Sequence, residues 1–486
     1  MIKRLKALLF NNTSVRQTVV KNIFWLFTSE FTGRLIRGFI VIYGARLLGA
    51  AQYGAFSYAM AVAGFITIFS DLGISAILTR ESVRNPGERD QYFSTALAIK
   101  TFFMLINTTI ILSIVPFVIR IEGAIPLLPI VALMLIFDTV REFSAGMFRA
   151  LERMEREAYI KIITNVAITI AGFSALYIAA TAKSLTIGYT IGSGVGFIGS
   201  VILLYPYFKN WFKNIRSHLI KRILVLAWPI GLLGVLGSIM INTDMVMLGW
   251  WQSAEQVGYY AAGQKPIQLL YVVPTLIASA VFPTFARLAR VNNERFRQVL
   301  EKSISIAMAV ALPAVAVGAI IAEKLITNQY IYGLGYMASV PTFMILLVTV
   351  IIVFPSTILS NALFAYNEQK QFIFFVAVGA ISNAVLDYFL IPRYGIEGSA
   401  VATVICQVFT NILVWRQMRK TNYFTITHRL PRILIATIIS AVIALLLNYT
   451  SLSVFINVLV AASVYVGALW ILREPILREV KEVISG

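Results

Sequence analysis

The stretch KNIFWLFTSEFTGRLIRGFIVIY, from Lys21 to Tyr43, is long enough to cross a lipid bilayer as one helix. Glu30, Arg34 and Arg37 lie in its middle, at spacings i, i+4 and i+7. At about 3.6 residues per turn these three side chains share one stripe of the helix. Each charge would cost roughly 3 kcal/mol if it faced lipid. The stripe must therefore face other protein segments or a water-filled cavity.

Two interpretations of this charged stripe stay open. Glu30 and Arg34 can pair with each other, and a structural ion pair would lock two helices together. Alternatively, the stripe is the polar wall of a cavity for an anionic cargo. Pairing with Glu30 uses at most one arginine, so the stripe keeps a surplus positive charge, and we favour the cavity.

The composition predicts an integral membrane protein. Hydrophobic residues make up 59% of the 486 residues, charged residues only 13%, and the mean hydropathy is +0.81. The formal charge of +19 would suit nucleic acid, but most basic residues flank apolar runs. We interpret them as topology signals and contacts with anionic membrane lipids, and we expect no nucleic-acid partner. The basic start MIKRLKALLF is too short for a cleavable signal peptide and predicts an interfacial segment.

No motif predicts a cofactor, a metal site or an enzyme. Cys406 is the single cysteine, and the two histidines, His218 and His428, lie far apart in basic loops. The chain has neither a P-loop for ATP nor a Gly-x-Ser-x-Gly elbow. Most segments between the apolar runs are too short to hold a soluble catalytic domain.

The apolar runs predict fourteen transmembrane helices. Their expected limits are 21–45, 54–79, 92–118, 124–149, 158–180, 184–206, 222–250, 257–286, 300–322, 337–364, 371–391, 396–418, 431–449 and 452–472. With the N-terminus in the cytoplasm, the inner segments carry 31 basic residues and the outer ones 5. This asymmetry predicts a multi-pass protein of the cytoplasmic membrane with both termini in the cytoplasm.

An internal echo predicts two matched bundles. Leu48-Gly49 and Tyr53-Gly54 follow the first span, and Leu248-Gly249 and Val257-Gly258 follow the seventh. Six spans repeated once keep their orientation, which implies two six-helix bundles related by a pseudo-twofold axis along the membrane normal, with the cargo path between them. The expected division is 1–206 for the N-terminal bundle, 207–221 for a cytoplasmic linker, 222–418 for the C-terminal bundle, and 419–486 for spans thirteen and fourteen with the tail.

Further charges in the N-terminal bundle are candidates for gating or coupling. In the fourth span Asp138, Arg141 and Glu142 share one broad face, as a cavity wall or as an inner gate. Lys100 in the third span can snorkel towards the interface, which is the interpretation we favour for it. Asp71 either caps a helix break or pairs with an arginine of the first span.

The second half offers one cation at membrane depth, Lys265, and one carboxylate, Asp244, which is a candidate for coupling or gating. Lys265 precedes Pro266, whose ring removes a backbone hydrogen bond and bends the helix. A lysine beside such a bend suits a moving helix that contacts an anion. A kinked structural helix with a Lys265–Asp244 pair is the alternative. Within the first bundle, Arg34, Arg37 and Arg141 outnumber the central carboxylates Glu30 and Asp138, which favours phosphate, pyrophosphate or an acidic sugar.

Several motifs in order resemble one family of transporters. They are Arg46-Leu47-Leu48-Gly49 with Tyr53-Gly54, Asp71-Leu72-Gly73 with Thr79-Arg80-Glu81, FRALERMEREAYIKI (Phe148 to Ile162), Asp244 with Leu248-Gly249, and LDYFLIPRYGIEGSAVAT (Leu386 to Thr403). From the first span to the twelfth, the chain resembles Wzx-type polysaccharide repeat-unit flippases of the MOP (multidrug/oligosaccharidyl-lipid/polysaccharide) exporter superfamily.

The resemblance implies alternating-access export of an oligosaccharide linked to polyprenyl or dolichyl pyrophosphate. It also implies a cationic cavity between the bundles, which would fit Arg34, Arg37 and Lys265. The chain is expected to act as a monomer, with H⁺ or Na⁺ coupling as an option. Alternatives are an ion-coupled multidrug or cation antiporter of the same fold, a lipid II flippase and, least favoured, a membrane enzyme such as a polysaccharide polymerase or ligase.

Overall fold

The computed structural model describes residues 15–426, 430–450 and 452–475. These residues form helices and short connections, and no strand occurs among them. The chain divides into two compact units, Met1–Gly258 and Tyr259–Gly486. The predicted interfacial segment at residues 1–10 and His428 lie outside the described residues.

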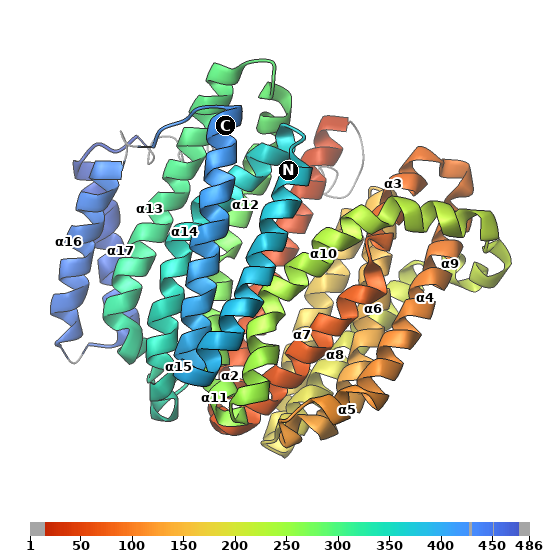
Figure 1. Cartoon of the computed structure of the whole chain (residues 1–486), viewed down its shortest axis with the longest axis horizontal. Coiled ribbons are helices and arrows are strands. Elements are labelled where there is room, and N and C mark those ends of the chain that lie inside the picture. Colours follow the sequence, from red (N-terminus) through yellow and green to blue (C-terminus); the bar gives the residue numbers. More distant parts are fainter. Residues whose placement is uncertain (1–14, 427–429, 451, 476–486) are drawn as a thin grey trace, which may run out of the picture. The chain divides into compact units, whose positions relative to one another are not determined.

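The described residues of the first unit form eight longer α-helices, which are connected mostly by short turns (Figure 1). They are α2 (Val15–Asp71), α3 (Ile74–Arg84), α4 (Arg89–Ser113), α6 (Leu128–Ala150), α7 (Met154–Ile178), α8 (Ala182–Leu203), α10 (Ser217–Trp251) and the start of α11 (Ala254–Leu270). Short helical turns lie between them: η1 (Pro86–Glu88), α5 (Val115–Val118), η2 (Glu122–Leu127), α9 (Tyr205–Lys209) and η3 (Trp211–Asn214).

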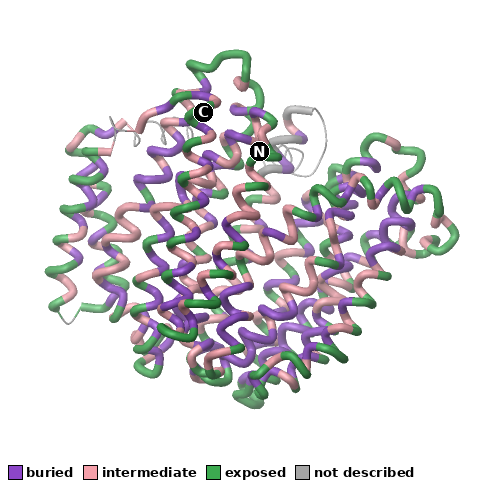
Figure 2. Tube along the Cα trace, viewed as in Figure 1, coloured by how far each residue is buried: buried purple, intermediate pink, exposed green. Residues whose placement is uncertain are grey.

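The second unit continues from α11 with six long helices and one 3₁₀ turn. They are α12 (Val272–Leu288), α13 (Asn293–Ile326), η4 (Leu334–Ser339), α14 (Val340–Ala365), α15 (Gln369–Thr421), α16 (Leu430–Asn448) and α17 (Val454–Ile471). The last two helices pack on α13, where Val317 and Ile321 meet Ala444, Val454 and Ala461 in a small apolar core. Figure 2 shows buried and exposed positions alternating along α16 and α17.

The prediction of fourteen spans is confirmed, because two of the long helices each contain two of the predicted spans. Among the described residues, twelve helices are long and apolar enough to cross a membrane. Two of them cover 61 and 53 residues, and a straight α-helix of that length would be about 80–90 Å long, far beyond the roughly 30 Å of a bilayer core. Both are interrupted by a glycine with left-handed backbone, Gly49 (φ 71°) and Gly395 (φ 60°). These glycines lie between the predicted first and second spans and between the eleventh and twelfth.

The second predicted span contains a helix break, and Asp71 caps it as one of the predicted alternatives. Helix α2 ends at Asp71, Leu72 and Gly73 have positive φ, and α3 starts at Ile74. The Asp71 carboxylate accepts hydrogen bonds from the Ser75 hydroxyl and from the Ser75 backbone N–H at 3.4 Å. This contact satisfies a donor that the helix start would otherwise leave open.

Helices α2 and α7 run parallel, as alternation requires of the first and fifth spans. Their contacts advance together along both helices: Lys21 bonds Glu155 at 3.0 Å, Glu30 bonds Lys161, and Arg37 bonds Asn165 at 2.9 Å. Because residue numbers increase in step on both sides, the two helices start at the same end of the unit. This parallel pair brings the charged stripe of α2 against a polar stripe of α7.

The two glycines of the sequence echo, Gly54 and Gly258, lie against each other within the first unit. A Cβ atom on Gly54 would come within 1.7 Å of the Ala254 carbonyl oxygen, and one on Gly258 within 2.0 Å of the Ala50 carbonyl oxygen. No side chain fits at that separation, so the backbones of α2 and α11 touch here through glycine.

Replacing Gly54 with alanine is therefore expected to destabilise the protein by about 1–3 kcal/mol, because the helices must move apart. Gly237 in α10 is the matched control, since a Cβ there meets nothing within 4 Å. Gly237→Ala should raise stability by up to about 1 kcal/mol through helix propensity. Thermal unfolding of the two purified variants measures the difference, and equal melting temperatures would contradict the close contact.

Candidate functional site

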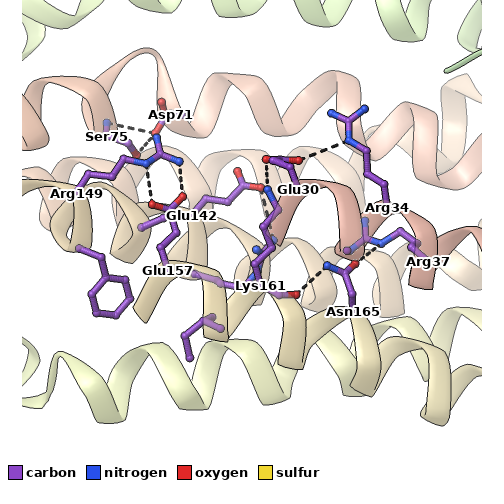
Figure 3. A pocket seen from close by; sticks show the side chains of 15 residues that line it. Glu30, Arg34, Arg37, Asp71, Ser75, Glu142, Arg149, Glu157, Lys161 and Asn165 are labelled. Atoms are coloured by element: carbon purple, nitrogen blue, oxygen red, sulfur yellow. Dashed lines mark hydrogen bonds and ion pairs between the residues drawn. The ribbon is translucent and has the colours of Figure 1, made fainter. Parts of the chain in front are cut away.

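A polar cavity of about 530 Å³ opens in the first unit between α2, α3, α6 and α7. Nine charged side chains line it (Figure 3). The cations are Arg34, Arg37, Arg141, Arg149 and Lys161, and the carboxylates are Glu30, Asp71, Glu142 and Glu157. The charged stripe of α2 thus faces a cavity, which is the interpretation that the sequence favoured over simple helix packing.

Glu30 lies at the centre of an ion-pair group. Its carboxylate accepts from Lys161 Nζ and lies 3.5 Å from Arg34 Nε, as the dashed lines in Figure 3 show. The predicted Glu30–Arg34 pair is confirmed, and Lys161 is an additional partner. The Arg34 side chain remains 49% exposed, so this pair does not bury it.

Arg37 is held by an amide instead of a carboxylate. Its Nε donates to Asn165 Oδ1 at 2.9 Å, and Asn165 Nδ2 donates in turn to the Lys161 carbonyl at 2.8 Å. Gly33 leaves room for this amide, because a Cβ there would come within 2.6 Å of Asn165 Nδ2. The contacts fix the amide orientation, and the neutral amide brings no negative charge to Arg37.

Helix α6 contributes three of the predicted charges. Arg141 donates to Asp138 at 2.9 Å and lies 3.6 Å from Glu142, so one guanidinium serves two carboxylates. Arg141 is mostly buried and Glu142 is 70% exposed. Arg141 and Glu142 line the cavity, whereas Asp138 contacts it only through Arg141. One more pair, which was not predicted from the sequence, joins α6 to α7: Arg149 Nε donates to Glu157 at 2.8 Å.

Asp71 and Lys100 form a pair that the sequence analysis did not anticipate. Lys100 Nζ donates to Asp71 Oδ1 at 2.5 Å and to the Ser75 hydroxyl at 2.9 Å. The Lys100 side chain is only 4% exposed, so the prediction that it snorkels towards the interface is wrong. The prediction that Asp71 pairs with an arginine of the first span is also wrong. Lys100 pairs with Asp71 instead, because α4, which carries Lys100, packs against α2.

The missed residues share a signal that the sequence does contain. Glu157, Lys161 and Asn165 are spaced i, i+4 and i+8, so they form one stripe on α7. The same rule identified Glu30, Arg34 and Arg37 on α2. Lys161 lies near the start of its predicted span, so it is one of the 31 basic residues assigned to the inner segments.

The charge balance decides which ligands this cavity suits. Each of its four carboxylates lies within 4 Å of a lysine or arginine nitrogen. Among the described residues, Arg37 is the one lining cation with no carboxylate within that distance. A cationic ligand would need to break an existing ion pair, whereas an anionic ligand meets a positive charge that is not yet neutralised.

Besides Asp138 and Lys100, two further predicted site residues do not line this cavity. Asp244 lies in α10 and is 2% exposed. Lys265 lies in α11, where its ammonium group donates to Gln268 at 3.3 Å. Their expected roles in cargo contact and gating stay predictions.

Known proteins match this chain as a family, as relatives and as solved structures. A family model described as polysaccharide biosynthesis protein matches residues 19–289, more than half of the chain. The chain belongs to this family. The matched range contains every residue that lines the cavity, and the family resemblance inferred from the sequence motifs is confirmed.

Relatives and solved structures align with a larger share of the chain than the family model does. A protein named probable flippase AglR from Haloferax volcanii is 22% identical over 418 residues, 81% of this chain and 82% of that protein. A structure of the lipid II flippase MurJ in an inward closed conformation aligns over 93% of this chain and 99% of that one, with a TM-score of 0.77 and 18% identity. An inward-facing multidrug resistance MATE transporter of the MOP superfamily covers 80% of this chain and 94% of its own, with a TM-score of 0.68 and 14% identity. The predicted transporter fold is confirmed.

Proposed function

We propose that this protein is a flippase that moves an oligosaccharide linked to a lipid pyrophosphate across the cytoplasmic membrane by alternating access. Membership of the polysaccharide biosynthesis family and similarity to a protein named as a probable flippase support this proposal. The proposal depends on one observation: Arg37 lines a polar cavity, and its guanidinium has no carboxylate partner among the described residues.

The chemistry of the cargo fits this arrangement. A pyrophosphate carries negative charges that a bilayer interior rejects, and arginine binds phosphate oxygens with two parallel donors. Arg37 uses Nε for Asn165, which leaves its two terminal nitrogens for the cargo. Arg34 and Arg141 add positive potential while they stay paired. The polyprenyl or dolichyl tail would remain in lipid while the headgroup passes through the polar cavity.

Movement would come from the two bundles predicted from the sequence, 1–206 and 222–418, which rock about the linker at 207–221. Both termini would lie in the cytoplasm, as the 31 basic residues of the inner segments favour over 5 outside. Lys265 would contact the headgroup from the second bundle, and the protein would act as a monomer.

An H⁺ or Na⁺ gradient is one energy source that this cavity would allow. Asp138 and Glu142 share Arg141, so protonation of one carboxylate would release part of the guanidinium for the cargo. The Asp71–Lys100 pair lies beside the helix break, and Asp244 is buried in α10. We expect both to couple a change in the cavity to movement of the neighbouring helices. Consumption of the cargo after export is the alternative energy source.

Ligand binding to the purified protein tests the proposal. We expect native mass spectrometry to detect a polyprenyl-pyrophosphate oligosaccharide bound to the full chain, with at least tenfold weaker binding of an organic cation such as tetraphenylphosphonium. Tighter binding of the cation would contradict the proposal and support a multidrug antiporter. Complementation of a peptidoglycan flippase defect would instead identify lipid II as the cargo.

A further inference from the structure

A second hollow, of about 510 Å³, lies in the first unit between α3 and the start of α10. Four of its lining residues are Arg80, Arg84, Lys221 and Arg222, and its one carboxylate is Glu81. The cargo cavity balances five cations with four carboxylates, whereas this hollow, called the α3–α10 groove below, holds four cations and one carboxylate. It is therefore the more strongly cationic of the two sites.

Glu81 pairs with three arginines of the groove and offsets only one of their positive charges. Its side chain is 1% exposed, and its oxygens lie 3.1 Å from Arg80, 3.7 Å from Arg84 and 3.0 Å from Arg222. One buried carboxylate thus fixes three guanidinium groups on two helices. Lys221 has no carboxylate within 4 Å among the described residues, so most of the positive charge in the groove stays available.

Packing keeps the groove in shape before any ligand arrives. The Arg222 guanidinium lies over the Tyr92 ring, 5.8 Å from its centroid. The Arg216 backbone N–H donates to Thr95 Oγ1 at 3.0 Å, which attaches the chain just before α10 to α4. Arginines that are already oriented lose little conformational entropy when they bind an anion.

The groove also has an apolar end. Val225 and Leu226 line it one turn beyond the two cations of α10, and Val225 is 58% exposed. Lys221 and Arg222 lie in the first two turns of α10, and Arg84 is the last residue of α3, so the cations lie at the ends of membrane-spanning segments. At this depth a ligand with a charged head and an apolar body matches both ends of the groove.

We propose that the α3–α10 groove is a binding site for the phosphate headgroup of an anionic membrane phospholipid. The phosphate would contact Arg84, Lys221 and Arg222, and the glycerol and first acyl carbons would cover Val225. The site is separate from the cargo cavity, with which it shares no lining residue. A bound phosphate would connect α3 to α10 and stabilise the packing of these two helices.

The test compares two double variants of the full-length protein. Arg84→Gln/Lys221→Gln removes two charges from the groove and leaves Glu81 paired with Arg80 and Arg222. The control variant Lys209→Gln/Lys213→Gln also removes two positive charges. Both of its positions are exposed, lie shortly before α10 and are outside the groove. Each protein in detergent is titrated with phosphatidylglycerol, phosphatidylcholine or inorganic phosphate and observed by native mass spectrometry.

We expect the unmodified protein to prefer phosphatidylglycerol over phosphatidylcholine. The groove variant should lose at least tenfold in affinity for phosphatidylglycerol, and the control variant less than twofold. Equal losses in both variants would overturn the proposal, because they would mean general attraction between basic residues and anionic lipid. Displacement of the lipid by millimolar inorganic phosphate would also overturn it in favour of a soluble phosphate ligand. Thermal melting of both variants verifies that each remains folded.

Discussion

Replacing Arg37 with alanine is expected to reduce cargo export at least tenfold, with an unchanged amount of protein in the membrane. The variant removes the one lining cation that has no carboxylate partner among the described residues. A charge-assisted hydrogen bond contributes about 1.5–3 kcal/mol, and about 1.4 kcal/mol corresponds to a factor of ten. Export of surface glycan in a strain that lacks its own flippase measures the effect.

Arg46 supplies the matched control for this variant. It lies on the same helix, nine residues further on, which at 3.6 residues per turn is the opposite face. Arg46 is exposed and does not line the cavity, so Arg46→Ala should retain nearly full export. Arg34→Ala should have a smaller effect than Arg37→Ala, because Arg34 is already paired with Glu30. Full export by Arg37→Ala would remove this residue from the mechanism.

The second large effect concerns the Asp71–Lys100 pair. Asp71→Asn should lower the free energy of unfolding by about 3–5 kcal/mol, because it leaves a buried ammonium group without its counter-charge. Lys100→Met should cost only about 1 kcal/mol, because the Asp71 side chain is 35% exposed and can be hydrated from the cavity. The order of the two effects follows from the unequal exposure of the partners.

The double variant Asp71→Asn/Lys100→Met separates charge pairing from other causes. Once Lys100 is apolar, the buried charge is gone, and the change at Asp71 should add little further loss. Unfolding of the three variants and the unmodified protein in the same detergent provides the comparison. Additive losses in the double variant would show that the two side chains act independently, contrary to the 2.5 Å contact between them.

The helices themselves follow from the sequence to within a few residues. A bilayer interior offers no water to bond the backbone, so an apolar run of about 20 residues must form a helix. The predicted spans 158–180 and 184–206 correspond to α7 (Met154–Ile178) and α8 (Ala182–Leu203). A helix break beside Asp71 was one of the two alternatives that the sequence offered. The Asp71 side chain can cap a helix, and Gly73 tolerates positive φ.

The partners of the charged residues could not be obtained in this way. Periodicity placed Glu30, Arg34 and Arg37 on one stripe of α2, but it does not identify the helix that this stripe contacts. Lys161 and Asn165, which bond Glu30 and Arg37, are 131 and 128 residues away in the chain. For Lys100, burial against α2 decided the outcome, and burial depends on how α4 packs.

The sequence by itself therefore determined that this chain spans a membrane many times, that fixed charges lie within those spans, and that these charges could not face lipid. Each conclusion depends on the chemistry of single helices in a solvent without water. Only the tertiary structure decided which charges neutralise one another and that Arg37 meets an amide instead of a carboxylate. The reason is that an ion pair depends on a distance of a few ångströms between helices far apart in the chain, and that distance is set by packing.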